Sequence, residues 1–255
     1  MATKMGPALA AIIFLASCAA TFEEEIANIH MLDEKSRISR SNAKKTYAYP
    51  KDCSGVRGSS GIYVIKPSLS PPIVVYCDMT TNGGGWTMIQ RNTQGSKITW
   101  NEYWTAYKYG FGDILQDHWL GNEHIYNIIN QGHFEIIFIL KRSSKTYHAN
   151  YNSFSIGNEA NGYQLRLGSF SGNTTNAMMQ YGSKYIHDNM KFTTIDRDQD
   201  LYSSNCAASC KGGFWFNSCY RVNINSKAIY WYGLGTCKLT EMLIKPTNLC
   251  KRPIK

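Results

Sequence analysis

Ile73-Val-Val-Tyr-Cys-Asp-Met-Thr-Thr-Asn-Gly-Gly-Gly-Trp-Thr-Met-Ile89 is the stretch that decides the local fold. Its apolar, β-branched beginning, Ile73–Tyr76, predicts one strand, and Trp86–Ile89 predicts a second. Asn82-Gly83 lies between them and is a strong hairpin signal. The glycine run lacks the lysine and the spacing of a phosphate-binding loop, so it predicts a turn that leads into a strand.

The predicted elements on both sides of this hairpin continue the β-rich pattern. The best strand signal, His133–Leu140, predicts a strand in the centre of a sheet. A helix is predicted over Asn122–Ile129. Further strands are predicted at Gly61–Ile65, Tyr151–Phe154 and Tyr163–Leu167. From Met190 onward glycine, asparagine and cysteine dominate, which predicts a loop-rich region held by disulfides and an ion.

An acidic loop precedes Cys206. The segment Thr194-Ile-Asp-Arg-Asp-Gln-Asp-Leu-Tyr-Ser-Ser-Asn-Cys206 places aspartates on alternate positions, at 196, 198 and 200. Alternate spacing lets two carboxylates face one point, and Ca²⁺ takes about 6–8 oxygen ligands, including backbone carbonyls. On spacing alone a solvated acidic turn competes with this interpretation, because the closing glutamate of an EF-hand is missing.

A series of sequence blocks frames this loop. After Asp52-Cys53 they are Ser60–Pro67, Val75–Thr81, Gly83–Arg91, Gly110–Asp113, Trp119–Ile125, Gly213–Phe216 and Thr240–Pro246. In this order, from about residue 50 to 246, they resemble the fibrinogen C-terminal domain family, the module also found in ficolins, tachylectins and angiopoietins. The resemblance is greatest to the short secreted fibrinogen-like proteins.

The resemblance implies an α+β fold. We expect a mixed, mainly antiparallel sheet with a loop-rich, calcium-binding and disulfide-stapled C-terminal region. It also implies two disulfides, Cys53–Cys77 and Cys206–Cys219. The domain should extend over residues 49–246.

The resemblance assigns ligands for a structural calcium ion. The family's side-chain ligands correspond to Asp198 and Asp200, and its carbonyl ligands to Tyr202 and Ser204. Asp196 is then expected to orient the loop. The ligand chemistry suits Ca²⁺, which is the cofactor that we expect.

The chain departs from the family's lectins at their acetyl-binding pocket. Where those lectins carry an aromatic residue and a histidine, this chain has Cys210 and Tyr220. Their Asn-Leu-Asn-Gly becomes Asn223-Ile-Asn-Ser226, and the loop that follows is largely deleted before Lys227. The acetyl-binding pocket of the lectins and the knob-binding pocket of fibrinogen both use residues of that loop. We therefore expect neither activity in this chain.

The cysteine count is odd after processing. The chain has 8 cysteines, of which Cys18 would leave with the signal peptide. We expect a compensating bond between Cys210 and Cys237, with Cys250 left for an intermolecular disulfide and a covalent homodimer. The alternative pairs Cys237 with Cys250 and leaves Cys210 free, and sequence does not separate the two.

The segments outside the domain predict secretion. Residues 1–20 combine Lys4, an apolar run and small residues before Thr21, which predicts a cleaved signal peptide. Residues 21–48 form a polar leader with a short predicted helix, and residues 247–255 form a basic tail. No other apolar run is long enough to span a membrane. Asn173-Thr-Thr175 predicts N-glycosylation of Asn173 in an exposed loop.

The net charge and the motifs restrict the classes of function that this chain can have. The net charge of +9 comes from scattered bases, which predicts weak glycosaminoglycan binding outside the cell and not a nucleic-acid partner. No nucleophile elbow, zinc motif or dinucleotide-binding glycine pattern is found, so no enzyme is expected. We expect a non-catalytic recognition or signalling protein that binds an extracellular protein or a partner, protein or glycan, on a cell surface. The alternatives are an innate-immune lectin for acetylated glycans and a haemostatic or matrix structural protein.

Overall fold

The computed structural model describes Met31, residues 48–180 and residues 184–247. The chain divides into two compact units, Met1–Ala48 and Tyr49–Lys255. The predicted signal peptide, the leader apart from Met31 and Ala48, and Cys250 lie outside the described residues. Within the described ranges no helix is long and apolar enough to cross a bilayer.

An antiparallel sheet forms the centre of the second unit. In the described part it has 10 strands, and every pairing between them is antiparallel. Its main path runs in the order β1 (Gly61–Ile65), β2 (Ile73–Asp78), β3 (Trp86–Thr93), β13 (Leu239–Pro246), β6 (Phe134–Arg142), β7 (Lys145–Ile156), β8 (Leu165–Leu167). The short strands β4 (Phe111–Gly112), β5 (His118–Trp119) and β9 (Phe170–Gly172) lie at its margins.

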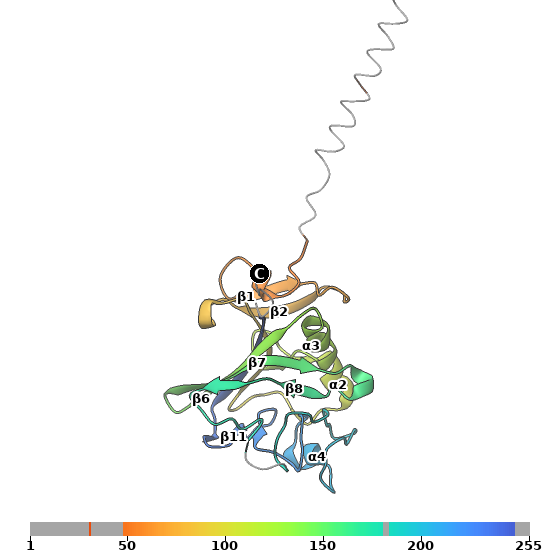
Figure 1. The fold of residues 1–255 in the computed structure, drawn as a ribbon, viewed down its shortest axis with the longest axis vertical. Helices are drawn as coiled ribbons and strands as arrows, with labels where there is room; N and C mark the ends of the chain where they lie inside the picture. The colour runs from red at the N-terminus through yellow and green to blue at the C-terminus, as the bar shows by residue number, and fades with distance from the viewer. Residues whose placement is uncertain (1–30, 32–47, 181–183, 248–255) are drawn as a thin grey trace, which may run out of the picture. The chain divides into compact units, whose positions relative to one another are not determined.

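Short helices and a small second sheet complete the described part. The α-helices are α2 (Trp104–Tyr109), α3 (Asn122–Ile129) and α4 (Cys206–Cys210), and the 3-10 turns are η1 (Cys53–Gly55), η2 (Thr81–Gly83) and η3 (Glu159–Asn161). The second sheet joins β10 (Val222–Asn223), β11 (Tyr230–Trp231) and β12 (Gly235–Thr236). Figure 1 shows β1 and β2 at one end of this unit, α4 and β11 at the other, and β6, β7 and β8 between them.

The two faces of the sheet differ in how they are filled. The inner face carries the main core, in which aromatic rings such as Trp119, Phe192 and Trp215 contact one another edge-on or tilted. A bulge in β3 turns Gln90 toward that core, where its amide donates to Asn225. The outer face carries a smaller cluster, made of Trp86, Met88, Ile137, Ile139 and Leu243, with Tyr76 packed against it.

The structure confirms the predicted α+β fold class, but the described sheet is wholly antiparallel where a mixed sheet was expected. The strand Gly61–Ile65 and the helix Asn122–Ile129 have the predicted bounds. The strand predicted at His133–Leu140 is β6, and it lies inside the sheet between β13 and β7, as expected for a run that is buried on both faces. The loop-rich region between β9 and β10 contains only α4 as a named element of its described residues.

Candidate functional site

Asp200 organises the acidic loop before α4. Its Oδ1 accepts a hydrogen bond of 3.0 Å from the backbone amide of Tyr202, and its Oδ2 accepts one of 2.9 Å from that of Cys206. The amide of Asp200 itself donates to Oδ1 of Asp198 at 3.3 Å. These bonds curl the loop and keep the carboxylates of Asp198 and Asp200 close enough to interact.

The electrostatics of this carboxylate pair favour a cation. Burial raises the pKa of Asp200 to about 6, the amides of Cys206 and Tyr202 oppose the rise, and the Asp198 carboxylate adds to it. A nearby positive charge stabilises the ionised form of such a group. The pair is therefore a candidate cation site on geometry and on charge.

The donor set decides which cation fits. No cluster of three or more His, Cys, Asp or Glu side chains in the described ranges could hold a metal, so further ligands would have to come from the backbone. Tyr202 and Ser204 are exposed, and their carbonyls accept no hydrogen bond from the described part of the chain. Two carboxylates with carbonyl oxygens are the hard donors that Ca²⁺ uses. The four predicted residues fit calcium by ligand type.

Asp196 anchors the loop and stands apart from the carboxylate pair. Its Oδ1 accepts hydrogen bonds of 2.8 Å from the amide of Trp104 at the start of α2 and of 2.7 Å from the hydroxyl of Thr194. The guanidinium of Arg197 lies 3.9 Å from the centre of the Trp104 ring. Asp196 thus holds the acidic loop against α2, in keeping with the orienting role expected from sequence.

Two predicted disulfides are present. Cys53 is bonded to Cys77, which joins η1 to β2, and Cys206 is bonded to Cys219, which joins the acidic loop to the chain before β10. Both Cys53 and Cys77 are fully buried. The prediction of these pairs is confirmed.

The predicted bond between Cys210 and Cys237 is wrong. Both residues are free thiols in the structure. Cys210 ends α4, whereas Cys237 follows β12, where its amide donates to the carbonyl of Ile229 at 2.9 Å and holds it in the small sheet. The chain therefore fixes the two thiols in separate elements. Cys250 lies outside the described residues, so its pairing stays a prediction.

A hollow of about 480 Å³ lies next to α4. It is lined by Thr99–Asn101, Ser209–Lys211, Tyr220, Asn223 and Ser226–Ala228, and we call it the recognition pocket. Cys210 and Tyr220, the two positions where the sequence departs from the family's lectins, both lie on its wall. The structure thus brings the altered positions together in one concave surface.

Several polar atoms in this pocket have no partner. Within the described residues, the indole nitrogen of Trp100 and the side-chain oxygen of Asn223 make no hydrogen bond, although the two residues are only 1% and 4% exposed. Buried polar groups are normally paired, because leaving one unpaired costs about 1–3 kcal/mol. Lys211 and Lys227 are exposed at the rim. The pocket lining therefore combines buried polar side chains that lack a partner in the described structure with two exposed positive charges.

Sequence reasoning missed part of this pocket. It identified Cys210, Tyr220 and the segment from Asn223, but not Trp100 or the rim lysines. Trp100 lies more than a hundred residues before the other wall, and no local pattern marks it as a neighbour of α4. Only the tertiary contacts bring the two segments together.

His187 braces the segment that carries Tyr220. Its Nδ1 lies 2.7 Å from the carbonyl of Trp215, and its Nε2 accepts hydrogen bonds from the amides of Arg221 and Val222 at 3.1 and 3.0 Å. Burial lowers the pKa of His187 to about 4, so the ring is neutral at physiological pH. The ring is structural, because both nitrogens are used within the fold.

The predicted glycosylation site is exposed. Oδ1 of Asn173 accepts a hydrogen bond of 2.6 Å from the amide of His148 on β7. The side chain is on the surface directly after β9. Glycosylation of Asn173 stays a prediction.

Comparison with known proteins gives these features a context. Residues 49–241 match the family of the C-terminal globular domain of fibrinogen beta and gamma chains. The chain is 46% identical over 195 residues to a fibrinogen-like protein 1-like protein of Gallus gallus, covering 74% of this chain and 69% of that protein. It is 35% identical over 244 residues to human angiopoietin-related protein 7, covering 87% and 68%. Among solved structures, the fibrinogen-like globe domain of human ANGPTL2 aligns with a TM-score of 0.71 at 34% identity, over 77% of this chain and 99% of that one.

Proposed function

This chain belongs to the family of fibrinogen C-terminal globular domains, a family of non-enzymatic proteins, and we propose that it is a secreted recognition or signalling protein. Its partner is an extracellular or cell-surface protein or glycan. The signal-peptide pattern in residues 1–20 supports secretion. The likeness to fibrinogen-like and angiopoietin-related proteins supports the signalling role.

The recognition pocket is the observation that carries this proposal. It brings Trp100, Tyr220 and Asn223 together in one concave surface, and concave surfaces with a few polar groups are where ligands bind most often. Lys211 and Lys227 favour a partner with acidic groups, and the net charge of +9 adds a weak, salt-sensitive attraction to sulfated glycans.

Calcium is part of the proposed recognition surface. Asp198 and Asp200 would bind Ca²⁺ through their carboxylates, and Tyr202 and Ser204 through their carbonyls. The ion would neutralise the paired carboxylates and hold the acidic loop in one conformation. The raised pKa of Asp200 supports this assignment, because burial and the charge of Asp198 both disfavour an uncompensated carboxylate there.

A covalent homodimer is the proposed assembly. Cys250 follows the last strand and lies in a tail that also carries Lys251, Arg252 and Lys255. A cysteine in such a position reaches another chain more easily than a buried thiol does. The odd cysteine count after loss of Cys18 supports an intermolecular bond.

Cell binding of charge-reversed variants tests the recognition proposal. The secreted chain, loaded with Ca²⁺, is titrated onto intact cells at physiological salt. Lys211→Glu with Lys227→Glu should weaken binding at least about tenfold, since each tenfold corresponds to about 1.4 kcal/mol. Asn223→Ala should weaken it without changing the charge.

Lys66→Glu with Lys145→Glu provides the matched control, because it also reverses two lysines. Both are exposed and neither is part of the pocket lining, so their reversal changes the net charge by the same amount without changing the pocket. If the control weakens binding as much as the rim variants do, attraction by net charge alone explains the binding. If none of the variants changes it, the pocket is not the recognition site.

A further inference from the structure

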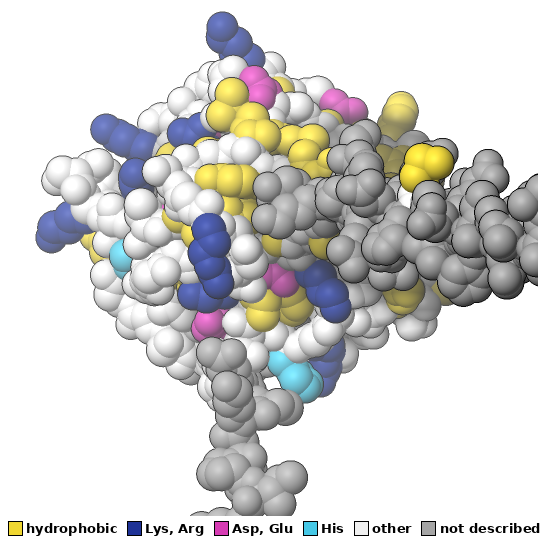
Figure 2. All heavy atoms as spheres, turned by 90° about the horizontal axis from the view of Figure 1, so that it is seen from above, with side chains coloured by type: hydrophobic (Ala, Val, Ile, Leu, Met, Phe, Trp, Pro, Cys, Tyr) yellow, Lys and Arg dark blue, Asp and Glu magenta, His cyan; other side chains and the backbone are white. Residues whose placement is uncertain are grey.

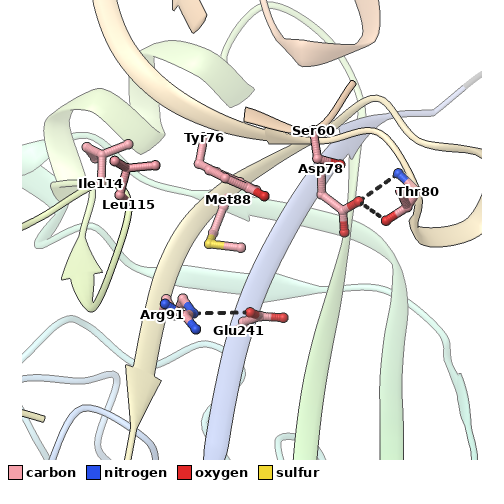
Figure 3. A pocket seen from close by; sticks show the side chains of 9 residues that line it. All are labelled: Ser60, Tyr76, Asp78, Thr80, Met88, Arg91, Ile114, Leu115 and Glu241. Atoms are coloured by element: carbon pink, nitrogen blue, oxygen red, sulfur yellow. Dashed lines mark hydrogen bonds and ion pairs between the residues drawn. The ribbon is translucent and has the colours of Figure 1, made fainter. Parts of the chain in front are cut away.

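A second pocket lies on the outer face of the sheet and shares no residue with the recognition pocket or the acidic loop. Its volume is about 250 Å³, and it lies where β2, β3 and β13 meet the turn that connects β4 and β5. Tyr76, Met88, Ile114 and Leu115 supply its apolar lining. In Figure 3 these side chains lie to one side and Asp78 to the other, with Arg91 and Glu241 below. We call it the outer pocket.

The outer pocket is acidic on an otherwise basic chain. Its charged lining consists of Asp78, Glu241 and Arg91, against a net charge of +9 for the whole chain. Asp78 is a stable anion: burial raises its pKa, but hydrogen bonds from Thr81 and Thr80 outweigh burial and lower it. The pocket thus keeps a fixed negative charge at its edge.

Glu241 is only partly compensated. Its carboxylate lies 3.3 Å from the guanidinium of Arg91, yet burial still raises the pKa of Glu241 above its usual value. Arg91 and Lys141 both favour the ionised form, but together they do not offset the cost of burying this carboxylate. A further cation next to the pair would stabilise it.

Exposed apolar side chains lie on the pocket wall and on strands β1 and β2. Leu115 on its wall is 59% exposed, and Ile62 and Val74, on the neighbouring strands β1 and β2, are 47% and 49% exposed. Figure 2 shows hydrophobic side chains gathered on the face at the end of β1 and β2, with isolated acidic groups beside them. A ligand with apolar and basic side chains matches this surface in both properties.

The chain itself carries such a segment and delivers it nearby. After Thr247, whose amide donates to the carbonyl of His133 at 2.8 Å, it continues as Asn-Leu-Cys-Lys-Arg-Pro-Ile-Lys255. The registers place Asp78, Trp86 and Lys245 near one line across three strands. Strands lie about 4.8 Å apart, so Asp78 is about 10 Å from the last part of β13. Eight extended residues reach about 26 Å, which is enough to turn back over the outer pocket.

We propose that the outer pocket binds the basic C-terminal segment of this same chain, residues 248–255. The apolar side chains of that segment pack on Tyr76, Met88 and Leu115, and its cations lie against Asp78 and Glu241. The docked segment covers apolar surface at this end of the sheet and holds Cys250 close to the folded domain.

A cysteine placed on the pocket wall tests this directly in the full chain. In Leu115→Cys, mild reduction first frees Cys250 from any bond between chains. On reoxidation of the diluted protein the new thiol should form a disulfide with Cys250 of the same chain, detected by peptide mass spectrometry. The control is Glu135→Cys. Glu135 pairs with Lys245 and is therefore nearer to the point where the segment leaves β13. A segment that moves at random would link to position 135 faster than to position 115. If the segment docks in the outer pocket, the disulfide at position 115 should form about tenfold faster than the one at position 135.

A charge reversal separates docking from mere proximity. Lys251→Glu with Arg252→Glu, added to Leu115→Cys, leaves the folded domain unchanged and should abolish the preference for position 115. The proposal is overturned if the disulfide forms no faster at position 115 than at position 135. It is also overturned if the charge reversal leaves the rate at position 115 unchanged. Mixing isotope-labelled with unlabelled protein shows whether a disulfide at position 115 lies within one chain or joins two. If it only joins two chains, the proposal is overturned and the pocket binds the segment of a second copy.

Discussion

The backbone amide of Cys206 donates a hydrogen bond of 2.9 Å to Oδ2 of Asp200. Cys206 is also bonded through its sulfur to Cys219, and the next residue, Tyr220, lines the recognition pocket. One hydrogen bond and one disulfide therefore connect the acidic loop to the pocket wall. A change in the charge or position of Asp200 should be transmitted to Tyr220 along this short connection.

Removing calcium should destabilise the wild type and leave Asp198→Ala unaffected. A ligand that binds only the folded state adds RT ln(1 + [L]/Kd), which is about 2.7 kcal/mol at a hundredfold excess over Kd. Chelator should therefore lower the melting temperature of the wild type, measured by calorimetry. Asp198→Ala should melt at a lower temperature and show no response to chelator.

Asp196→Ala is the control for this prediction. Asp196 is also an acidic residue of the same loop, but it binds the amide of Trp104 and the hydroxyl of Thr194. Its loss should lower the melting temperature both with and without Ca²⁺, and the shift on chelation should persist. A wild type that chelator leaves unmoved would show that the loop is not a calcium site.

Local patterns in the sequence predict much of this fold. Gly61–Ile65 and Asn122–Ile129 have their predicted bounds because strong local signals, a β-branched run and a helical apolar spacing, agree with their burial. The strand predicted over Tyr151–Phe154 is only part of β7, which extends over Lys145–Ile156. At the half-exposed ends of a strand, apolar and polar residues alternate only weakly, so the sequence does not mark where the strand begins and ends.

Long-range pairing is what the sequence does not show. The insertion of β13 between β3 and β6 joins residues about a hundred positions apart or more, and no local pattern encodes that register. The outer pocket depends on it, since Glu241 meets Arg91 only through this pairing. The wrong Cys210–Cys237 bond has the same origin, because thiol proximity is a tertiary property that cysteine counting cannot supply.

Acid should destabilise the fold through His187. The pKa of His187 is about 4 in the folded state, against 6.5 for an ordinary histidine side chain. As the pH falls from 6.5 to 4, His187 binds a proton in the unfolded chain but not in the folded one. The free energy of unfolding is therefore highest above pH 6.5 and decreases through this window. The difference corresponds to about 3 kcal/mol. Urea unfolding at stepped pH values measures it.

His187→Gln isolates this contribution from that of the carboxylates. Glutamine can still accept from the amides of Arg221 and Val222, but it does not titrate. The variant should be less stable than the wild type at pH 7, and the gap should narrow as the pH falls toward 4. A gap that stays constant with pH would assign the acid sensitivity to other groups.

The recognition pocket should not bind acetylated sugars. Cys210 and Tyr220 occupy the positions where the family's lectins carry an aromatic residue and a histidine, and the following loop is short. We expect no retention on acetylated resin and no binding of N-acetylglucosamine at millimolar concentration by calorimetry. Retention followed by elution with chelator would instead establish the protein as a lectin.

The unpaired thiols differ in reactivity, and this predicts which of them links two chains. Burial, together with the charge of Asp200, raises the pKa of Cys210 to about 12. Burial also raises the pKa of Cys237, which is 1% exposed. Because the thiolate is the species that forms disulfides, both should react slowly at neutral pH. Cys250, next to Lys251 and Arg252, should react fastest.

The secreted wild type should therefore run partly at twice its mass on a non-reducing gel, and Cys250→Ser should run as a monomer. Cys210→Ser is the matched control: it removes a free thiol from the recognition pocket and should leave the dimer intact, because that thiol is protonated and half-buried. Peptide mapping of the dimer should find Cys250 joined to Cys250. A wild type that stays monomeric with Cys250 joined to Cys237 would contradict the prediction and leave Cys210 as the unpaired thiol.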